Sequence, residues 1–112
     1  MKVGHLSYTM TRGLLWDRLV IVKNRRTHRV FKPTEAKCNL ALENDVVYEV
    51  PVEITSEGGI YLKVLPEDTF DISVGTHDFD ILCPVRGYWT VVAKGTLVVE
   101  DLVLVDDLPE NV

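Results

Sequence analysis

Apolar and polar residues alternate with a period of two along most of this 112-residue chain. Such alternation is typical of β-strands that bury one face and expose the other. The alternating or strongly apolar stretches are residues 6–10, 16–23, 30–31, 36–42, 46–54, 60–64, 77–83 and 88–101. We therefore expect about seven to eight short strands.

Turn-forming residues separate these stretches. Gly13, the polar loop 24–29, Lys32-Pro33-Thr34, Asn44-Asp45, the run 56–59 and the hairpin 84–87 each follow or precede a strand. Residues 66–70 begin with proline followed by carboxylates, which predicts one short helical turn. Pro51 cannot donate to a ladder and indicates an edge strand, and Gly95 predicts a bulge in the last strand.

Composition supports the same fold class. The chain has 18 Val, 5 Ile and 9 Thr, against 3 Ala and no Gln. β-Branched side chains lose rotamer freedom in a helix and pack well on a pleated sheet. We predict an all-β, immunoglobulin-like β-sandwich of antiparallel strands, with a small barrel as the alternative. Residues 1–105 form the single predicted domain, and residues 106–112 form an acidic C-terminal tail.

The charge is divided unequally along the chain. Residues 1–37 hold nine basic and two acidic side chains, a net charge of +7, and residues 38–112 hold three basic and fifteen acidic, a net charge of −12. The two halves sum to the formal charge of −5. We expect a basic surface on one part of the fold and an acidic surface elsewhere, so that opposite patches can meet across neighbouring copies.

Apolar runs reach only four residues, as in residues 19–22 and 102–105, whereas a membrane-spanning helix needs about 20. The segment 1–15 is interrupted by polar residues, so we expect no export signal. Cys38 and Cys83 could form one disulfide or remain two thiols. Without an export signal we favour buried, reduced thiols.

Signatures of enzymes are missing from the sequence. It has no glycine-rich phosphate loop, no nucleophile elbow and no zinc-ligand spacing. His77, Asp78 and Asp80 resemble metal ligands in type, but adjacent strand residues point to opposite faces, so we interpret the aspartates as a solvated face. We therefore expect a non-enzymatic protein with no catalytic residues, no cofactor and no metal.

The most concentrated charge lies between residues 23 and 29, and three interpretations remain open: a solvated loop, a protein contact, or a nucleic-acid contact. Nucleic acid is the least favoured, because the net charge is negative and no aromatic platform accompanies the arginines. We expect Trp89 to lie in the core, and Trp16, beside two leucines, to serve an interface. The candidate interface residues are Trp16, Lys23, Arg25, Arg26, His28, Arg29 and Pro51.

The order of strand and turn types resembles a known family. The features are Trp16–Lys23, the basic turn, the run 31–37, Gly58-Gly59 before the strand 60–64, Pro66–Thr69, the run 74–81, Gly87-Tyr88 and the run 93–99. Over residues 14–103 this resembles the small immunoglobulin-like β-sandwich domains of tailed-bacteriophage virion proteins, including the N-terminal domain of baseplate upper proteins. Tyrosine is common in the family where this chain has His77 or Phe79.

The resemblance implies a structural protein of the phage particle, assembled in the host cytoplasm. Its expected place is the tail, baseplate or fibre region, where it acts as an adaptor in several symmetric copies that dock on other virion proteins. A capsid decoration protein, or a soluble module that binds a host protein or glycan, is the alternative. No membrane partner is expected.

Overall fold

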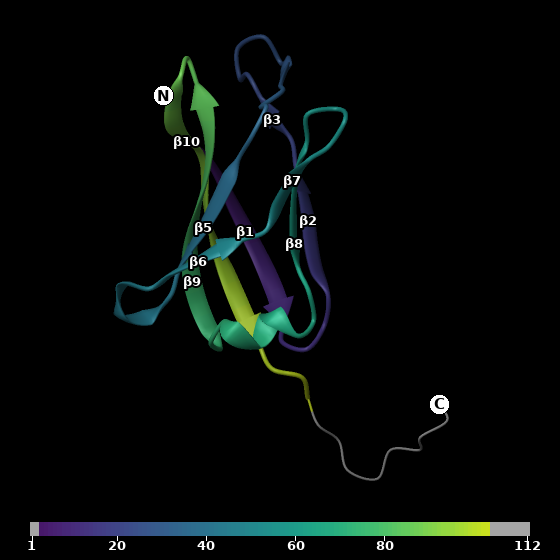
Figure 1. Cartoon of the computed structure of the whole chain (residues 1–112), viewed down its shortest axis with the longest axis vertical. Helices are drawn as coiled ribbons and strands as arrows, with labels where there is room; N and C mark the ends of the chain where they lie inside the picture. The colour runs from purple at the N-terminus through teal and green to yellow at the C-terminus, as the bar shows by residue number, and fades with distance from the viewer. Residues whose placement is uncertain (1–2, 104–112) are drawn as a thin grey trace, which may run out of the picture.

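The computed structural model describes residues 3–103, and this part of the chain is built almost entirely of β-strands (Figure 1). The predicted tail 106–112, with residues 104–105 of the predicted domain, lies outside the described residues. The strands are β1 (Gly4–Thr11), β2 (Trp16–Val20), β3 (Val22–Lys23), β4 (Val30–Phe31), β5 (Lys37–Ala41), β6 (Val47–Val50), β7 (Val52–Ile54), β8 (Ile60–Val64), β9 (Gly75–Val85) and β10 (Tyr88–Glu100).

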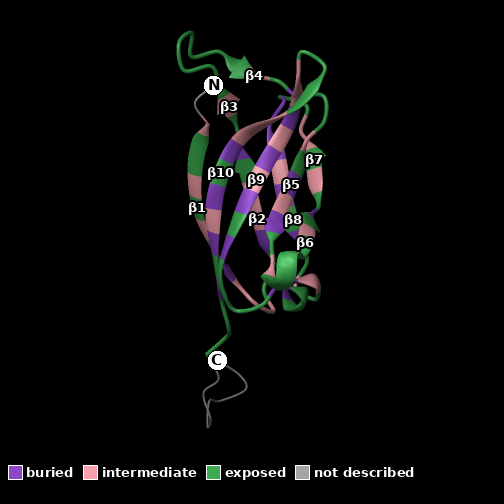
Figure 2. Ribbon diagram, turned by 90° about the vertical axis from the view of Figure 1, so that its left-hand side faces the viewer, coloured by how far each residue is buried: buried purple, intermediate pink, exposed green. Residues whose placement is uncertain are grey.

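Two sheets pack face to face and form a sandwich. The larger has the strand order β1-β10-β9-β5-β6, the smaller has the order β2-β8-β7, and β3 and β4 form a separate two-stranded ribbon at one end. Buried and exposed residues alternate along the strands (Figure 2). The core contains Met10, Leu40, Phe79, Ile81, Leu97 and Val99 from the larger sheet and Trp16, Val20, Ile60, Leu62 and Val64 from the smaller. The all-β sandwich predicted from the alternation is confirmed.

Two details differ from the prediction. The described residues form ten strands rather than seven or eight, because the stretches 16–23 and 46–54 are each interrupted. In addition, β1 pairs with β10 in parallel, from Gly4 opposite Ala93 to Thr11 opposite Glu100. After β1 the chain crosses to the smaller sheet, so its pairing with the last strand is not a hairpin contact and need not be antiparallel.

Pro51 marks the point at which the chain passes from one sheet to the other. β6, before it, pairs with β5 in the larger sheet, and β7, after it, pairs with β8 in the smaller sheet. Both are edge strands, as the proline predicts. A residue without an N–H interrupts a ladder, which is compatible with a change of sheet.

The bulge in β10 lies at Val92 and not at Gly95. The register with β9 shifts between Val91 and Ala93, and one extra residue reverses the faces of everything before it. Trp89 therefore lies on the outer face, 42% exposed, with the Lys37 Nζ 4.2 Å from its ring centroid. The expectation of a core role for Trp89 is wrong.

Trp16 shows the opposite error, because it lies in the core rather than at an interface. It is 5% exposed, its indole N–H donates to the Thr9 carbonyl at 3.1 Å, and its ring meets the Tyr8 ring edge-on at 5.9 Å. Since Trp16 is in the smaller sheet and Tyr8 in the larger, this contact joins the two sheets. The candidate interface loses its largest predicted anchor.

Two 3-10 turns, η1 (Glu43–Asp45) and η2 (Asp68–Asp71), lie at the end of the sandwich opposite the β3–β4 ribbon (Figure 1). η2 confirms the helical turn predicted near residues 66–70. The β9–β10 hairpin closes with only Arg86 and Gly87, both at positive φ, a tighter turn than the predicted 84–87. Among the described residues, no helix is long and apolar enough to cross a membrane.

Both cysteines are buried and free, as favoured by the sequence. They lie on the inner face of the larger sheet, where burial raises the pKa of the Cys38 thiol to about 12, with a smaller contribution from the Asp80 carboxylate. Burial also raises the pKa of Cys83. Both thiols therefore stay protonated at neutral pH and fill space in the core.

Candidate functional site

The loop between β3 and β4 is held in one shape by Asn24. Its side-chain Oδ1 accepts hydrogen bonds from the backbone N–H groups of Arg26, at 2.9 Å, and Thr27, at 3.0 Å. The Asn24 backbone closes the loop, since its N–H donates to the Arg29 carbonyl and its carbonyl accepts from His28, both at 2.8 Å. This Asx-type arrangement leaves the side chains of Arg25, Arg26 and Arg29 exposed.

A groove of about 1070 Å³ lies beneath this loop, where the ribbon and the edge of the larger sheet diverge. The lining comes from four places: the start of β1, the segment from β2 through β4, the end of β9 and the bulge of β10. Its apolar side chains are Leu6, Val20, Ile21, Val22, Val30, Phe31, Val85, Val92 and Ala93. The floor of the groove is therefore hydrophobic.

The rim of the groove is cationic. Its cations are Lys23, Arg25, Arg26 and Arg29; His5 also lines the groove, and no Asp or Glu is among its lining residues. Within residues 3–103, the salt bridge found is Arg12 to Asp101, at 3.2 Å, and it involves none of the rim residues. The rim charge is thus not neutralised by a carboxylate of the described chain, and we call this feature the basic groove.

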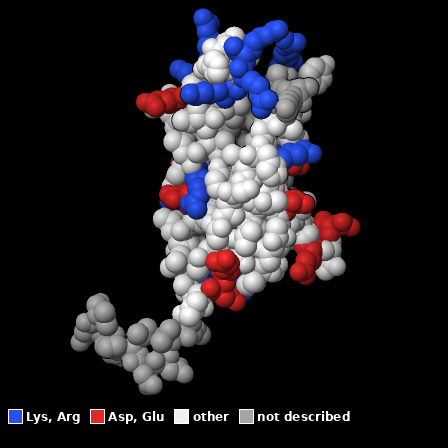
Figure 3. Space-filling view, turned by 180° about the vertical axis from the view of Figure 1, so that it is seen from behind, with Lys and Arg blue, Asp and Glu red and all other residues white. Residues whose placement is uncertain are grey.

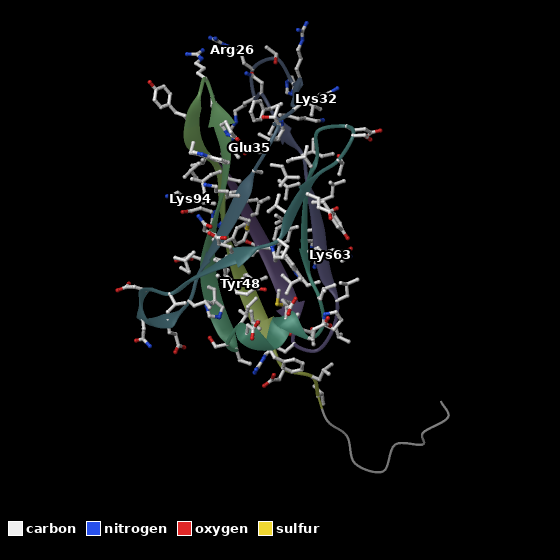
Figure 4. All side chains as sticks on the ribbon, viewed as in Figure 1. Arg26, Lys32, Glu35, Tyr48, Lys63 and Lys94 are labelled. Carbon is white, nitrogen blue, oxygen red and sulfur yellow. The ribbon has the colours of Figure 1, made fainter. Side chains whose placement is uncertain are left out.

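The space-filling view shows the same separation of charge over the whole molecule. Lysine and arginine gather at the end that carries the basic groove, and aspartate and glutamate predominate toward the other end (Figure 3). Arg26 and Lys32 both lie at the groove end, while Lys63 and Lys94 lie midway along the sandwich (Figure 4). The basic and acidic surfaces expected from the sequence are therefore opposite ends of one body.

The structure brings together only part of the predicted interface. Lys23, Arg25, Arg26 and Arg29 line the basic groove, and His28 is exposed in the same loop, at a φ of 58°, without lining it. Pro51 lies apart, in a separate depression of about 280 Å³ along β5 and β6.

Several lining residues were not among the candidates, namely His5, Leu6, Val85, Val92 and Ala93. They come from strands far apart in sequence, and two belong to the bulge that the sequence places wrongly. The one signal for this end of the molecule was the net charge of +7 over residues 1–37, the segment that contains His5 and Leu6.

The stretch 77–80 does not bring its potential metal ligands together. Its side chain is buried, and Nε2 lies 2.7 Å from the Ser73 carbonyl, while Asp78 is exposed on the opposite face. Among the residues that the structure describes, no group of three potential metal ligands comes together. The opposite orientation of neighbours on a strand explains this.

The groove offers binding chemistry. Its lining within residues 3–103 contains no Asp, Glu, Ser or Cys; the ionisable side chains are His5, Lys23 and three arginines, and Thr27 supplies the one side-chain hydroxyl. Cations around an apolar floor attract a surface that combines carboxylates with an apolar side chain.

No protein-family model matches the chain, and no curated protein matches it. Among solved structures, the crystal structure of the Lin-41 filamin domain has a similar fold, with a TM-score of 0.53 over 82% of each chain and 15% sequence identity. At this identity the likeness concerns the fold alone. It confirms the prediction that the chain is an all-β sandwich of the immunoglobulin-like type.

Proposed function

We propose that this chain is a non-enzymatic structural protein of a tailed-phage virion, an adaptor of the tail, baseplate or fibre region that docks on neighbouring virion proteins. The virion setting rests on the order of strand and turn types over residues 14–103, which resembles small sandwich domains of such particles. The observation that carries the docking role is the basic groove, whose rim charge has no carboxylate partner within residues 3–103.

An unneutralised rim favours a partner that brings its own carboxylates. Clustered charge accelerates the encounter with an oppositely charged surface, by a factor of roughly 10 to 1,000. The apolar floor then supplies the burial that holds the complex together, since the centre of a protein interface is apolar and its edge is polar. The basic groove has both parts in the corresponding positions.

A protein partner suits the basic groove better than nucleic acid does. Binding to single strands relies on aromatic side chains on which bases stack, and Phe31 is the one aromatic residue of the described lining. It is half-buried in the β3–β4 ribbon. The formal net charge of −5 also opposes the approach of a polyanion over long distances.

Incorporation into particles tests this proposal. The variant Arg25→Glu/Arg26→Glu reverses the charge of the rim, and Lys63→Glu/Lys94→Glu changes the charge by the same amount on the flanks of the sandwich. Each is supplied in trans to a phage that lacks the gene, and purified particles are quantified by mass spectrometry. We expect the wild type and the flank variant in the particles and the rim variant reduced at least tenfold.

Absence of the wild-type chain from mature particles would overturn the virion role and favour a module that binds a host molecule. Equal incorporation of the rim variant would overturn docking through the basic groove. Recovery of the chain with capsids lacking tails would move the role to capsid decoration.

A further inference from the structure

The end of the sandwich opposite the basic groove carries an acidic and apolar projection. η2 carries Asp68, which is half-buried, Asp71, which is exposed, and Phe70, which is 56% exposed. The other carboxylates near this end of the sandwich belong to Glu43, Asp45, Glu67, Glu100 and Asp101. Burial raises the pKa of Tyr48 in β6, and the carboxylates of Asp68 and Asp71 raise it further.

Thr69 holds η2 in place. Its side chain is fully buried, and its hydroxyl donates to the Pro66 carbonyl at 2.6 Å and accepts from the Gly13 N–H at 2.7 Å. The Arg12 guanidinium carbon lies 5.4 Å from the Phe70 ring centroid and steadies the ring from one side. Phe70 is therefore an exposed aromatic residue on a well-anchored turn, which is the usual character of an interface anchor.

This projection, Asp68–Asp71, carries the carboxylates that the lining of the basic groove lacks. It is acidic and apolar, whereas the groove has a basic rim and an apolar floor. The two features lie at opposite ends of a body that measures 56 Å along its longest axis (Figures 1 and 3). Because the two sheets separate them, the projection of one molecule does not reach its own groove.

We propose that the occupant of the basic groove is the Asp68–Asp71 projection of a second copy of this chain, so that molecules associate head to tail. This inference rests on the docking site of the proposed function and names its partner. Phe70 packs on the apolar floor formed by Val22 and Phe31, and Asp68 and Asp71 face the arginines of the rim. Such a contact uses two different surfaces and closes into a ring or continues as a filament.

The contact joins charges at an exposed rim, and such charges are screened beyond ~8 Å at physiological ionic strength. We therefore expect an affinity that falls as the salt concentration rises.

Complementation between two charge-reversed variants tests the proposal. Arg25→Glu/Arg26→Glu blocks the groove and keeps the projection, while Asp68→Lys/Asp71→Lys blocks the projection and keeps the groove. Sedimentation velocity at low salt is expected to show concentration-dependent association of the wild type and monomers for each variant alone. An equal mixture is expected to regain association, because the unchanged projection of the first variant meets the unchanged rim of the second, and the new lysines of the second meet the new glutamates of the first.

A second pair of variants separates the apolar anchor from general surface effects. Phe70→Ala is expected to weaken self-association at least tenfold, and Leu19→Ala, at a side chain of similar exposure (54%) on the flank of the smaller sheet, to leave it unchanged. Circular dichroism verifies that each variant is folded.

A wild type that stays monomeric at low salt, or a variant mixture that stays monomeric, overturns head-to-tail association. Association of the wild type that both charge-reversed variants retain overturns it as well. These outcomes are distinguishable from failure of the proposed function, because incorporation into particles that depends on Arg25 and Arg26 would still indicate a different acidic partner.

Discussion

Gly95 is a position where the packing tolerates no side chain. A Cβ there would lie 2.4 Å from the Leu6 carbonyl oxygen and 2.5 Å from Cζ of Phe79. The Phe79 ring covers the glycine from the neighbouring strand and lies parallel to the Tyr8 ring, with 6.0 Å between centroids. The sequence singled out Gly95 as a bulge, but its role is to admit an aromatic ring.

Gly95→Ala is therefore expected to lower the free energy of unfolding by about 1–3 kcal/mol, the usual cost of overpacking a core. Gly4→Ala is the matched control, because its nearest neighbour would be 4.0 Å away, and we expect a change within ~0.5 kcal/mol. Urea unfolding measures both. Equal stability of the two variants would contradict the close approach at Gly95.

The two tryptophans also lead to opposite expectations. Trp16→Ala removes a buried ring that joins the sheets and is expected to cost about 3–5 kcal/mol. Trp89→Ala removes an exposed ring and one lysine contact, so we expect a loss below ~1 kcal/mol. Urea unfolding followed by far-UV circular dichroism, which does not depend on either tryptophan, distinguishes them. A larger loss for Trp89 would contradict the placement of the bulge.

Cys38 makes stability depend on alkaline pH. Its pKa is about 12 in the folded chain, against 9.0 for an unperturbed thiol, so the unfolded chain loses this proton first. The free energy of unfolding therefore falls as pH rises from about 9 toward about 12, by ~1 kcal/mol from this group at pH 10. Cys38→Ala is expected to reduce that decline, measured by urea unfolding at neutral and alkaline pH; an unchanged slope would contradict it.

At the scale of the element, the β3–β4 hairpin loop depends on one side chain. Asn24→Ala removes the acceptor for the N–H groups of Arg26 and Thr27, both of which are solvent-exposed. We expect the global stability to change by less than ~1 kcal/mol. Amide exchange of loop residues should accelerate, because the loop loses its internal hydrogen bonds. Unchanged exchange would show that the backbone closure alone holds the loop.

The strands also show how much of the fold could be predicted from the sequence. Alternation located nearly every strand, because a sheet with one wet face repeats every two residues, and the faces of residues 77–83 were predicted correctly. The bulge at Val92 was not predictable, since nothing in Val91-Val92-Ala93 differs locally from a regular strand. The parallel pairing of β1 with β10 depends on chain path and has no local signal.

Only part of the lining of the basic groove could be predicted from the sequence. Charge clustering identified Lys23, Arg25, Arg26 and Arg29 because they lie close in the sequence. The groove floor could not be found by this means, since it is assembled from strands more than 60 residues apart, such as Val22 and Val92. Pro51 was singled out for its edge position, which is correct, but that edge lies away from the groove.

At the scale of the whole molecule, the domain carries most of its basic side chains at one end and most of its acidic side chains toward the other (Figure 3). The formal charge of −5 is a sum over the whole chain and does not give the charge of either end. A charge distribution of this kind orients molecules during an encounter and leaves the final affinity to the apolar contact. Under the proposed function, the partner is the molecule whose carboxylate-bearing surface reaches the basic groove.

The proposed docking of the basic groove on a carboxylate-bearing surface is tested most directly by zero-length carboxylate-to-amine cross-linking of purified particles. Lys23 lies on the groove rim, while Lys63 and Lys94 lie on the flanks. We predict that mass spectrometry finds Lys23 joined to an Asp or Glu of another polypeptide or another copy, and that high salt before cross-linking removes the product. Lys23 left unlinked while Lys63 or Lys94 is joined to a neighbour would contradict docking through the basic groove.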